Sequence, residues 1–215
     1  MTQNLILENL RVSYQANKLD IDDCDPRPEK QFDKWFKEAL HSECDEPNAL
    51  VLSTVFQGQP RGRVVLLKGV SPEGFLFYTN YSSAKGIEIQ SNDKAAATFL
   101  WLPLQRQVRI EGVIKKVDQT TSEEYFHKRP RGSQLGAIAS PQSQKVSSRA
   151  DLERMFSEAE KKFEHVKILP RPAEWGGYVI TPTYFEFWQG RDNRMHDRIV
   201  YLKQASGWDL QRLAP

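Results

Sequence analysis

The 215-residue sequence is poor in the features that mark a metal site, a disulfide framework or a membrane protein. Its two cysteines, Cys24 and Cys44, form no C-x-x-C pair and have no histidine at a spacing typical of metal ligands. We therefore expect two reduced thiols and no metal. No apolar run approaches the roughly 20 residues of a membrane-spanning helix, and residues 1–14 lack the apolar core of a signal peptide. These absences predict a cytoplasmic protein.

An excess of charge of one sign is also missing. The chain has 30 basic and 28 acidic residues, which leaves a formal net charge of +2. This balance gives no general case for nucleic acid or an anionic membrane as a partner, so any anion site has to be built locally. The catalytic motifs G-x-S-x-G, H-E-x-x-H and G-x-G-x-x-G and the Walker loop are absent. His41, His127 and His165 fall in predicted helices or at their edges, and we expect them at the surface.

Short apolar runs separated by turn residues make up most of the chain, a pattern typical of an antiparallel sheet or barrel. Residues 1–28 are polar and irregular and predict a flexible arm, while residues 29–215 predict one domain. Helices are expected over residues 29–41, 83–92 and 149–166, and from a capping-box signal at Thr121 to a stop at Pro130. Strands are expected over residues 49–56, 62–70, 74–80, 95–102 and 107–117, as two or three strands between 178 and 202, and near 208–213.

The segment NRMHDR (193–198) carries the densest polar pattern on a predicted strand. Because side chains alternate along a strand, Arg194, His196 and Arg198 would share one face. Two guanidinium groups beside an imidazole are costly to bury unless an anion or a polar ring lies against them. A solvated edge strand explains the pattern equally well.

A second cluster lies in TSEEYFHKRPRGS (121–133). Tyr125 and Arg129 are four residues apart and therefore share a helix face, and Ser133 follows just beyond Pro130. A phenol, a guanidinium and a hydroxyl at a helix end suit a phosphate monoester. An exposed helix with a basic C-terminus is the simpler alternative.

Two further segments contain cations near predicted strand ends. In YTNYSSAKG (78–86), Lys85 lies in the first turn of a serine-capped helix, where backbone N–H groups attract phosphate. In RVVLLK (63–68), Arg63 and Lys68 face opposite ways on a regular strand, so a shared site needs a sheet edge, a second chain or a bulge. Both segments are also compatible with ordinary caps and strand ends.

Taken in order, these segments resemble the pyridoxamine 5′-phosphate oxidase family. The matching segments include RVVLLK, FYTN, RQVRIEG, YFHKRPRGSQLGAIAS, WGGY, EFWQGRDNRMHDRI and the terminal RLAP, and they span residues 49–215. The resemblance implies a mainly β protein with helices, a split β-barrel that binds flavin mononucleotide (FMN) between the subunits of a homodimer. It also implies oxidation of pyridoxamine 5′-phosphate and pyridoxine 5′-phosphate to pyridoxal 5′-phosphate. A hydride would pass to FMN, and O2 would be reduced to hydrogen peroxide.

The resemblance also implies roles for individual residues. Those expected to bind FMN are Arg63, Val64, Val65, Leu66, Leu67, Lys68, Tyr78, Thr79, Lys85, Gln107, Gln142, Ser143, Trp188 and Arg198. Those expected to bind substrate are Lys68, Tyr125, Arg129, Ser133, Arg194 and His196. Arg194 and His196 are also the expected catalytic residues, and which of them acts as a base is left open, although arginine is an unfavourable base at its normal pKa.

One departure from the family concerns position 84. The family usually has Ser-Arg-Lys at this helix start, whereas this chain has Ser83-Ala84-Lys85. A charge-assisted hydrogen bond is worth roughly 1.5–3 kcal/mol, so the sequence predicts weaker FMN binding unless Arg61 or another cation substitutes.

Two alternatives of other classes are considered. A flavin-binding split barrel without this oxidase activity would keep RVVLLK and FYTN but should lack the Tyr125/Arg129/Ser133 and Arg194/His196 sets, which are present here. A nucleic-acid-binding barrel could stack bases on its aromatic residues, but the near-neutral charge argues against it.

Overall fold

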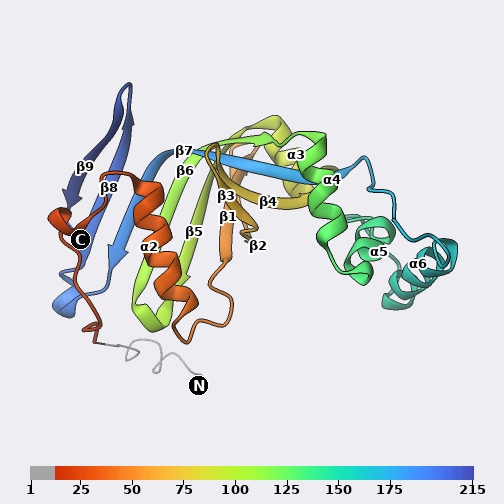
Figure 1. Cartoon of the computed structure of the whole chain (residues 1–215), viewed down its shortest axis with the longest axis horizontal. Coiled ribbons are helices and arrows are strands. Elements are labelled where there is room, and N and C mark those ends of the chain that lie inside the picture. Colours follow the sequence, from red (N-terminus) through yellow and green to blue (C-terminus); the bar gives the residue numbers. More distant parts are fainter. Residues whose placement is uncertain (1–12) are drawn as a thin grey trace, which may run out of the picture. The chain divides into compact units, whose positions relative to one another are not determined.

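The computed structural model describes residues 13–215, and Figure 1 shows the order of their helices and strands. The first part of the predicted arm, residues 1–12, lies outside the described residues. The strands are β1 (Ala49–Phe56), β2 (Gln59–Leu66), β3 (Gly69–Ser71), β4 (Gly74–Asn80), β5 (Lys94–Trp101), β6 (Arg106–Lys116), β7 (Trp175–Gln189), β8 (Asp197–Gln204) and β9 (Gly207–Leu213). The helices are α2 (Pro28–Leu40), α3 (Ala84–Ser91), α4 (Gln119–Lys128), α5 (Arg131–Ala139) and α6 (Arg149–Lys162), with short 3-10 turns η1 (Ile21–Asp23), η2 (Leu102–Leu104) and η3 (Asp192–Arg194).

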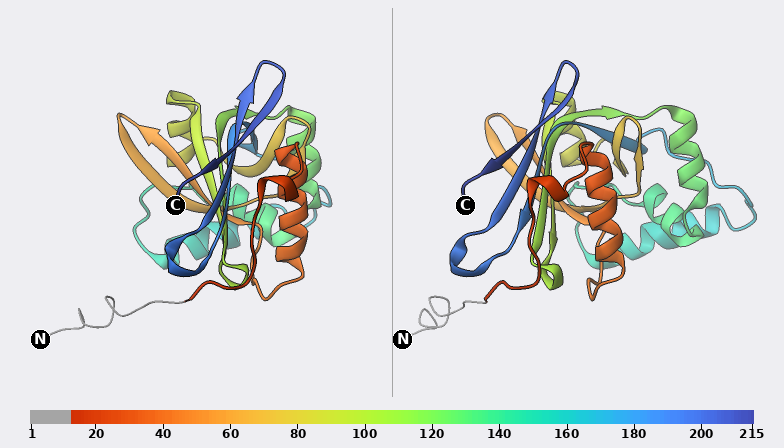
Figure 2. Two further views of the ribbon diagram at one scale, coloured as in Figure 1. Left: turned by 90° about the vertical axis from the view of Figure 1, so that its left-hand side faces the viewer. Right: turned by 60° about the vertical axis from the view of Figure 1, so that its left-hand side comes forward.

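The strands form one sheet in the order β2-β1-β5-β6-β7-β4-β3, with β8 paired to β7 and β9 paired to β8. β1 and β2 form an antiparallel hairpin in which Leu52 lies opposite Arg63. Figure 2 shows β8 and β9 as a second hairpin, also antiparallel, that leads to the C-terminus. The prediction of a mainly β protein with helices is confirmed.

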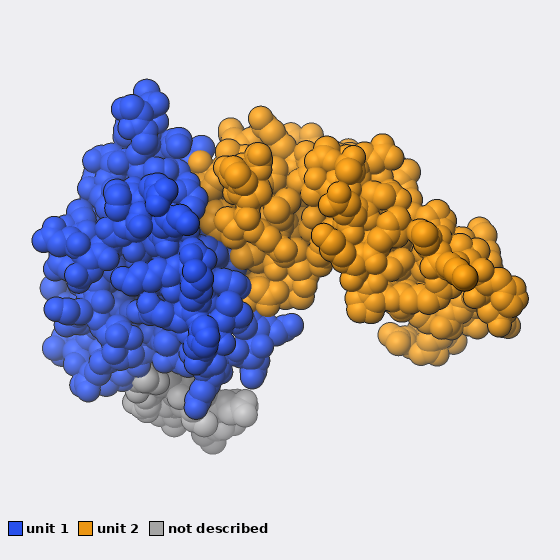
Figure 3. Space-filling view, in the orientation of Figure 1, with its two compact units in different colours: residues 1–47, 98–110, 183–215 blue, residues 48–97, 111–182 orange. Residues whose placement is uncertain are grey.

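The contacts within the chain define two compact units, which Figure 3 colours separately. Unit 1 contains the described residues up to 47 together with residues 98–110 and 183–215, and unit 2 contains residues 48–97 and 111–182. Strands β5, β6 and β7 each contribute residues to both units. The predicted site residues are therefore divided between the two units.

Helix α2 supplies the buried face of unit 1. Phe32, Trp35 and Ala39 are almost fully buried, and their spacing of three and four residues puts them on one side of the helix. The Trp35 ring meets Phe187 edge-on, with 5.2 Å between centroids. The Arg106 guanidinium lies 4.3 Å from the centre of the Trp35 ring and donates to Gln189 Oε1 at 2.8 Å. These contacts fix α2 against the ends of β6 and β7.

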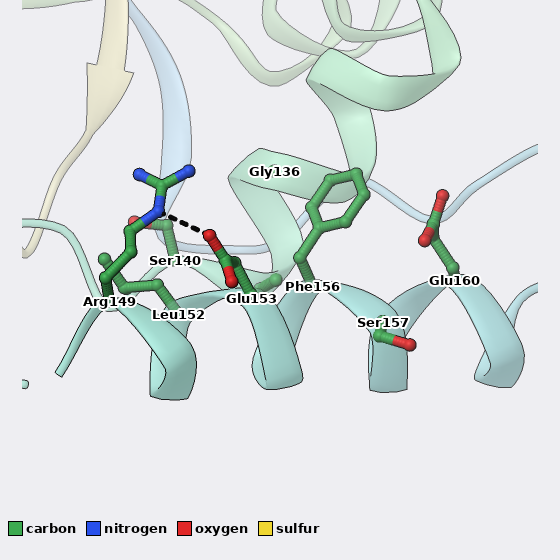
Figure 4. Close-up of a pocket in the computed structure, with 9 residues that line it drawn as sticks. Gly136, Ser140, Arg149, Leu152, Glu153, Phe156, Ser157 and Glu160 are labelled. Carbon is green, nitrogen blue, oxygen red and sulfur yellow. Dashed lines mark hydrogen bonds and ion pairs between the residues drawn. The ribbon is translucent and has the colours of Figure 1, made fainter.

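Three helices of unit 2, α4, α5 and α6, pack around Trp175 at the start of β7. Phe126 of α4, Leu135 of α5 and Ala159 of α6 belong to the same buried cluster as Trp175. Figure 4 shows the open groove between α5 and α6, with Leu152 and Phe156 on its wall and an ion pair between Arg149 Nε and Glu153 Oε1 at 2.8 Å. Phe156 and Phe163, which are partly buried, pack against the same cluster.

Prolines account for two differences from the sequence predictions. Pro130 ends α4 as expected, but it also stands immediately before α5, a helix that the sequence analysis missed. Proline suits a helix start because the first N–H groups have no intrahelical partner. Pro182 does not divide β7, because it lies between the pairing with β4, which ends at Ile180, and the pairing with β8, which begins at Tyr184. Residues 175–189 therefore form one strand.

Two local predictions are also corrected. The cap of α4 is Asp118, whose carboxylate accepts from Thr121 N at 2.7 Å, so Thr121 lies inside the helix. The run 62–70 divides into β2 and β3 at Leu67 and Lys68. There the Leu67 N–H bonds Asn48 O and the Lys68 N–H bonds Leu76 O, both at 2.8 Å.

Candidate active site

The start of α3 brings a lysine to the end of β4. Ser83 caps the helix by accepting from Gly86 N at 3.3 Å. A Cβ at Gly86 would lie 2.1 Å from the Tyr81 carbonyl oxygen, so only glycine allows this close approach of helix and strand. Lys85 is consequently held beside the last residues of β4.

Lys85 is surrounded by neutral oxygen atoms. Its Nζ donates to Thr79 Oγ1 at 3.1 Å and to Gln142 Oε1 at 3.4 Å, and Thr79 Oγ1 donates to the same amide oxygen at 3.0 Å. Burial lowers the pKa of Lys85, and the nearby Arg63 lowers it further. No carboxylate within residues 13–215 forms an ion pair with this ammonium group. An anion would satisfy it better than these dipoles do.

Two arginines of β2 converge on one carboxylate of α3. Glu88 is 1% exposed, and its Oε2 accepts from Arg63 Nη2 and Thr54 Oγ1, both at 2.6 Å. Its Oε1 accepts from Arg61 Nη1 at 3.0 Å. Burial opposes the charge on Glu88, but these hydrogen bonds and the arginines lower its pKa overall.

The RVVLLK segment leaves strand β2 after Leu66. Val64 is 66% exposed and Leu67 is buried, while Val65 and Leu66 are intermediate. Because β2 ends at Leu66, the alternation that separates Arg63 from Lys68 on a regular strand does not apply to Lys68. The Lys68 side chain is exposed.

A stack of aromatic rings in unit 2 carries the second predicted cluster. Tyr125 of α4 stacks on Tyr78 of β4, with 3.8 Å between centroids, and Tyr78 stacks on Trp175 at 5.6 Å. The Arg129 guanidinium lies 4.7 Å from the Trp175 ring centre. Its Nη1 is buried without a hydrogen-bond partner among the described residues, and burial lowers the pKa of Arg129. A buried guanidinium nitrogen without a partner is costly.

Serines and an amide of the predicted site lie around α5. Ser133 is exposed in the first turn of α5, four residues after Arg129. Gln142 and Ser143 follow the helix in a loop where Ser143 has a φ of 69°. The structure thus brings Gln142 to Thr79 and Lys85, and Tyr125 to Tyr78.

In unit 1, the turn between β7 and β8 corrects the strand predicted for residues 194–196. Asn193 and Arg194 have φ values of 54° and 60°, and β8 begins only at Asp197. Arg194 therefore lies in a tight turn with an exposed side chain, and the prediction that Arg194, His196 and Arg198 share one face of a strand was wrong. Left-handed φ values at two successive residues end the extended conformation.

His196 lies at the end of that turn, against two aromatic rings. The centroid of its imidazole is 4.6 Å from that of Trp188 and 5.8 Å from that of Tyr14. The Arg191 backbone N–H donates to His196 Nδ1 at 3.1 Å, so in the neutral ring the proton resides on Nε2. Burial lowers the pKa of His196, with a further contribution from Arg194. The neutral ring is consequently a hydrogen-bond donor through Nε2.

Arg198 is held from two sides on β8. Its Nε donates to Glu186 Oε1 at 2.8 Å and its Nη1 to the carbonyl oxygen of Ala214 at 2.9 Å. The Glu186 side chain is 3% exposed and also pairs with Arg109 Nη1 at 3.0 Å. Gln107, the remaining predicted residue of this unit, is half-buried on β6.

Sequence reasoning missed Glu88, Glu186 and Tyr14. Glu186 had a visible signal, since it is an acid within the aromatic run YFEFW. Glu88 and Tyr14 had no such signal, because their partners lie far away in the sequence.

The sequence also predicted that the protein has no metal site and no membrane-spanning helix. Within residues 13–215, no three His, Cys, Asp or Glu side chains are grouped as metal ligands, and no helix is long and apolar enough to cross a bilayer.

Comparison with known proteins assigns the family. The model of the pyridoxamine 5′-phosphate oxidase family matches residues 36–163, more than half of the chain. This chain belongs to the pyridoxamine 5′-phosphate oxidase family. The model of the pyridoxine 5′-phosphate oxidase C-terminal dimerisation region also matches residues 175–215, which include β7, β8, β9 and the predicted residues Trp188, Arg194, His196 and Arg198.

Relatives of this family share about half of their residues with the chain. The pyridoxine/pyridoxamine 5′-phosphate oxidase of Salinibacter ruber is 50% identical over 212 residues, which cover 97% of this chain and 99% of the relative. The protein of the same name from Aliarcobacter butzleri is 51% identical over 211 residues, with the same coverage. The matching regions thus extend over nearly the whole of each protein.

Solved structures confirm the split-barrel fold of the family. PhzG from Burkholderia lata 383, in complex with tetrahydrophenazine-1-carboxylic acid, superposes with a TM-score of 0.86 at 25% identity and covers 95% of this chain and 100% of its own. A pyridoxamine 5′-phosphate oxidase-related, FMN-binding protein from Nostoc punctiforme superposes with a TM-score of 0.69 at 17% identity, covering 85% and 96%. At that identity the second likeness concerns the fold alone.

Proposed function

We propose that this chain oxidises pyridoxamine 5′-phosphate and pyridoxine 5′-phosphate to pyridoxal 5′-phosphate with FMN as cofactor. Family membership and the half-identical relatives of that name support the assignment. The structural observation that carries it is the buried Arg129 Nη1 without a partner among the described residues. A phosphate monoester would supply the missing acceptor and the missing negative charge.

The substrate phosphate is assigned to the cluster around Arg129. The Tyr125 phenol and the Ser133 hydroxyl flank Arg129 in sequence on α4 and α5, and the first turn of α5 adds backbone N–H groups. The substrate ring is assigned to Lys68, Arg194 and His196. Each role is carried over from the family to the position of this chain that matches the family's motif.

The residues present fit the phosphate of FMN. The hydrogen-bond partners of Lys85 among the described residues are all neutral, and the Thr79 hydroxyl, the Gln142 amide and the start of α3 lie around it. These groups would hold the FMN phosphate and ribityl chain. The other residues proposed for the cofactor are Arg63, Val64, Val65, Leu66, Leu67, Lys68, Tyr78, Gln107, Ser143, Trp188 and Arg198.

The chemistry that FMN supplies when bound is the acceptance of a hydride from the exocyclic carbon, with O2 as the final acceptor and hydrogen peroxide as its product. The chain orients the substrate and manages its protons. Because Nδ1 of His196 already accepts from Arg191 N, we assign Nε2 of the neutral ring as a donor to a substrate oxygen or nitrogen. Arg194 supplies fixed positive charge from the turn.

We further propose that FMN binds at the interface of a homodimer in the cytoplasm. The match to the dimerisation region over residues 175–215 supports the dimer. The cytoplasmic location is supported by the two cysteines, which are both free thiols, as is usual in a reducing compartment.

The deciding experiment uses the purified protein saturated with FMN. Pyridoxine 5′-phosphate is added in air, and pyridoxal 5′-phosphate and hydrogen peroxide are followed together. Equal amounts of both products are expected. If neither appears although FMN binds, the chain is a flavin-binding relative with another substrate. Unphosphorylated pyridoxine is the control, because turnover as fast as with the ester would show that Arg129 does not receive a phosphate.

Two variants test the residues of the β7–β8 turn. His196→Asn keeps a hydrogen-bonding side chain without an imidazole, and Arg194→Lys keeps the charge without the planar guanidinium. We expect each to lower kcat of the FMN-saturated enzyme. Unchanged turnover in both would mean that neither residue acts in the oxidation.

A further inference from the structure

Strand β2 places the side chains of Arg61 and Arg63 on the same face. They are two residues apart, so their side chains leave the strand on one face, and both guanidinium groups bind the Glu88 carboxylate. Arg63 also donates to Thr54 Oγ1 and to the Leu52 carbonyl oxygen. The hydrogen bond of Arg61 to Glu88 uses only Nη1, and the Arg61 side chain is 44% exposed. A guanidinium carries five N–H donors, so Arg61 keeps donors for a further acceptor.

The charges in this cluster do not cancel. Arg61, Arg63 and Lys85 are three cations, and Glu88 is the carboxylate that pairs with two of them. The formal sum is therefore +2 (three positive charges and one negative charge). Such an excess in a partly buried site is stabilised by a dianion, and a phosphate monoester carries nearly two negative charges at neutral pH.

The position of Glu88 on α3 relates Arg61 to Ala84. Residues four apart in a helix are neighbours on its surface, so Ala84 lies one turn before Glu88 on the same side. Ala84 is exposed at the first position of α3 and contributes no charge. Arg61, fixed by Glu88, thus brings a guanidinium to the helix face from which an arginine at position 84 would project.

We propose that Arg61 is an additional FMN-phosphate residue of this chain, positioned by Glu88, and that it supplies the positive charge that Ala84 lacks. The proposal rests on the proposed function only in taking FMN as the cofactor. Weak FMN binding was expected unless Arg61 or another cation substitutes for an arginine at position 84, and the proposal makes Arg61 that substitute.

The test measures cofactor affinity of the apoprotein by quenching of flavin fluorescence, with FMN and riboflavin as paired ligands. Riboflavin lacks the phosphate, so a contact with the phosphate affects FMN alone. The variants are Arg61→Ala, Arg61→Gln, Ala84→Arg and the double variant Arg61→Ala/Ala84→Arg. Arg154→Ala on α6 is the matched control, because Arg154 is also a surface arginine with acidic partners.

We expect Arg61→Ala and Arg61→Gln to raise the Kd for FMN about tenfold and to leave the Kd for riboflavin unchanged. The side-chain amide introduced by Arg61→Gln can still donate to Glu88, so this variant separates the loss of charge from the loss of the hydrogen bond. The double variant should return to within about threefold of the wild-type Kd, and Arg154→Ala should not differ from wild type.

Two results would overturn the inference. One is an unchanged Kd for FMN in both Arg61 variants, and the other is an equal loss of FMN and riboflavin affinity, which would indicate a purely structural role. Thermal unfolding of each apoprotein identifies variants that do not fold, and Arg61→Gln remains informative if Arg61→Ala does not. Failure of the proposed function is distinguishable, because it would appear as wild-type protein that binds no FMN or yields no pyridoxal 5′-phosphate.

Discussion

Arg198 of unit 1 and Arg129 of unit 2 are both predicted site arginines, but they differ in what holds them. Arg198 is bound by the buried Glu186 carboxylate and by the Ala214 carbonyl oxygen. Arg129 lies over Trp175 with a buried Nη1 that has no hydrogen-bond partner among the described residues. The comparison teaches that the apoprotein satisfies the guanidinium of Arg198 internally but leaves Nη1 of Arg129 without an acceptor among the described residues, as we propose for a residue that binds a ligand.

The largest expected effect concerns the internally held arginine. Glu186→Gln removes the charge that pairs with Arg198 and Arg109, and we expect the free energy of unfolding to fall by roughly 3 kcal/mol. Urea denaturation measures it. Glu158→Gln on α6 is the control, because Glu158 is 63% exposed and should change stability by less than about 0.5 kcal/mol. Equal stabilities of the two variants would remove the distinction between the arginines.

The next effect concerns the arginine without a partner. Arg129→Ala should raise KM for pyridoxine 5′-phosphate roughly 30-fold, which corresponds to about 2 kcal/mol, with little change in the free energy of unfolding. Steady-state kinetics on FMN-saturated enzyme and urea denaturation measure the two quantities. A loss of stability with an unchanged KM would show that Arg129 serves the fold.

A smaller effect separates the capping of α3 from its role in the site. Ser83→Ala removes the side-chain acceptor of Gly86 N and should cost about 1 kcal/mol of stability. Ser148→Ala is the matched control, because Ser148 caps α6 in the same way. We expect only Ser83→Ala to weaken FMN binding. Weakening in both variants would point to a general loss of folded protein.

The smallest effect is the pH dependence due to His196. The folded-state pKa of this residue is lowered, by burial and by Arg194, so the unfolded chain binds its proton more readily. Stability attributable to the neutral ring is therefore complete above about pH 6.5 and decreases as the pH falls from there towards the lowered pKa. Unfolding curves of wild type and His196→Asn between about pH 5 and pH 8 measure it, and parallel curves would contradict the shift.

Local sequence patterns predicted much of the fold. The strands over residues 49–56 and 74–80 have the expected bounds, because turn residues delimit them. The helix predicted over residues 149–166 begins at Arg149 as expected but ends four residues early, at Lys162. Helix α5 was missed because Pro130 reads as a stop, although it also precedes a helix start. The turn at Arg194 was missed because a left-handed φ at arginine has no sequence signal.

The candidate site was predicted less completely than the fold. The segment motifs indicated the cations Arg63, Lys85 and Arg129, yet the state of each depends on partners elsewhere. Glu88 neutralises part of the charge of Arg63, whereas Arg129 meets an aromatic ring. Such pairings arise from tertiary contacts, so no spacing rule within one segment predicts them.

The central claim is that Arg129 binds the substrate phosphate, whereas Lys85 and its neighbours Thr79 and Gln142 bind the cofactor phosphate. The most direct measurement titrates pyridoxal 5′-phosphate into FMN-loaded wild type and Arg129→Ala, and FMN into the two apoproteins. The account predicts that Arg129→Ala weakens binding of pyridoxal 5′-phosphate by about tenfold or more and leaves the Kd for FMN unchanged. Weaker FMN binding with unchanged binding of pyridoxal 5′-phosphate would contradict it.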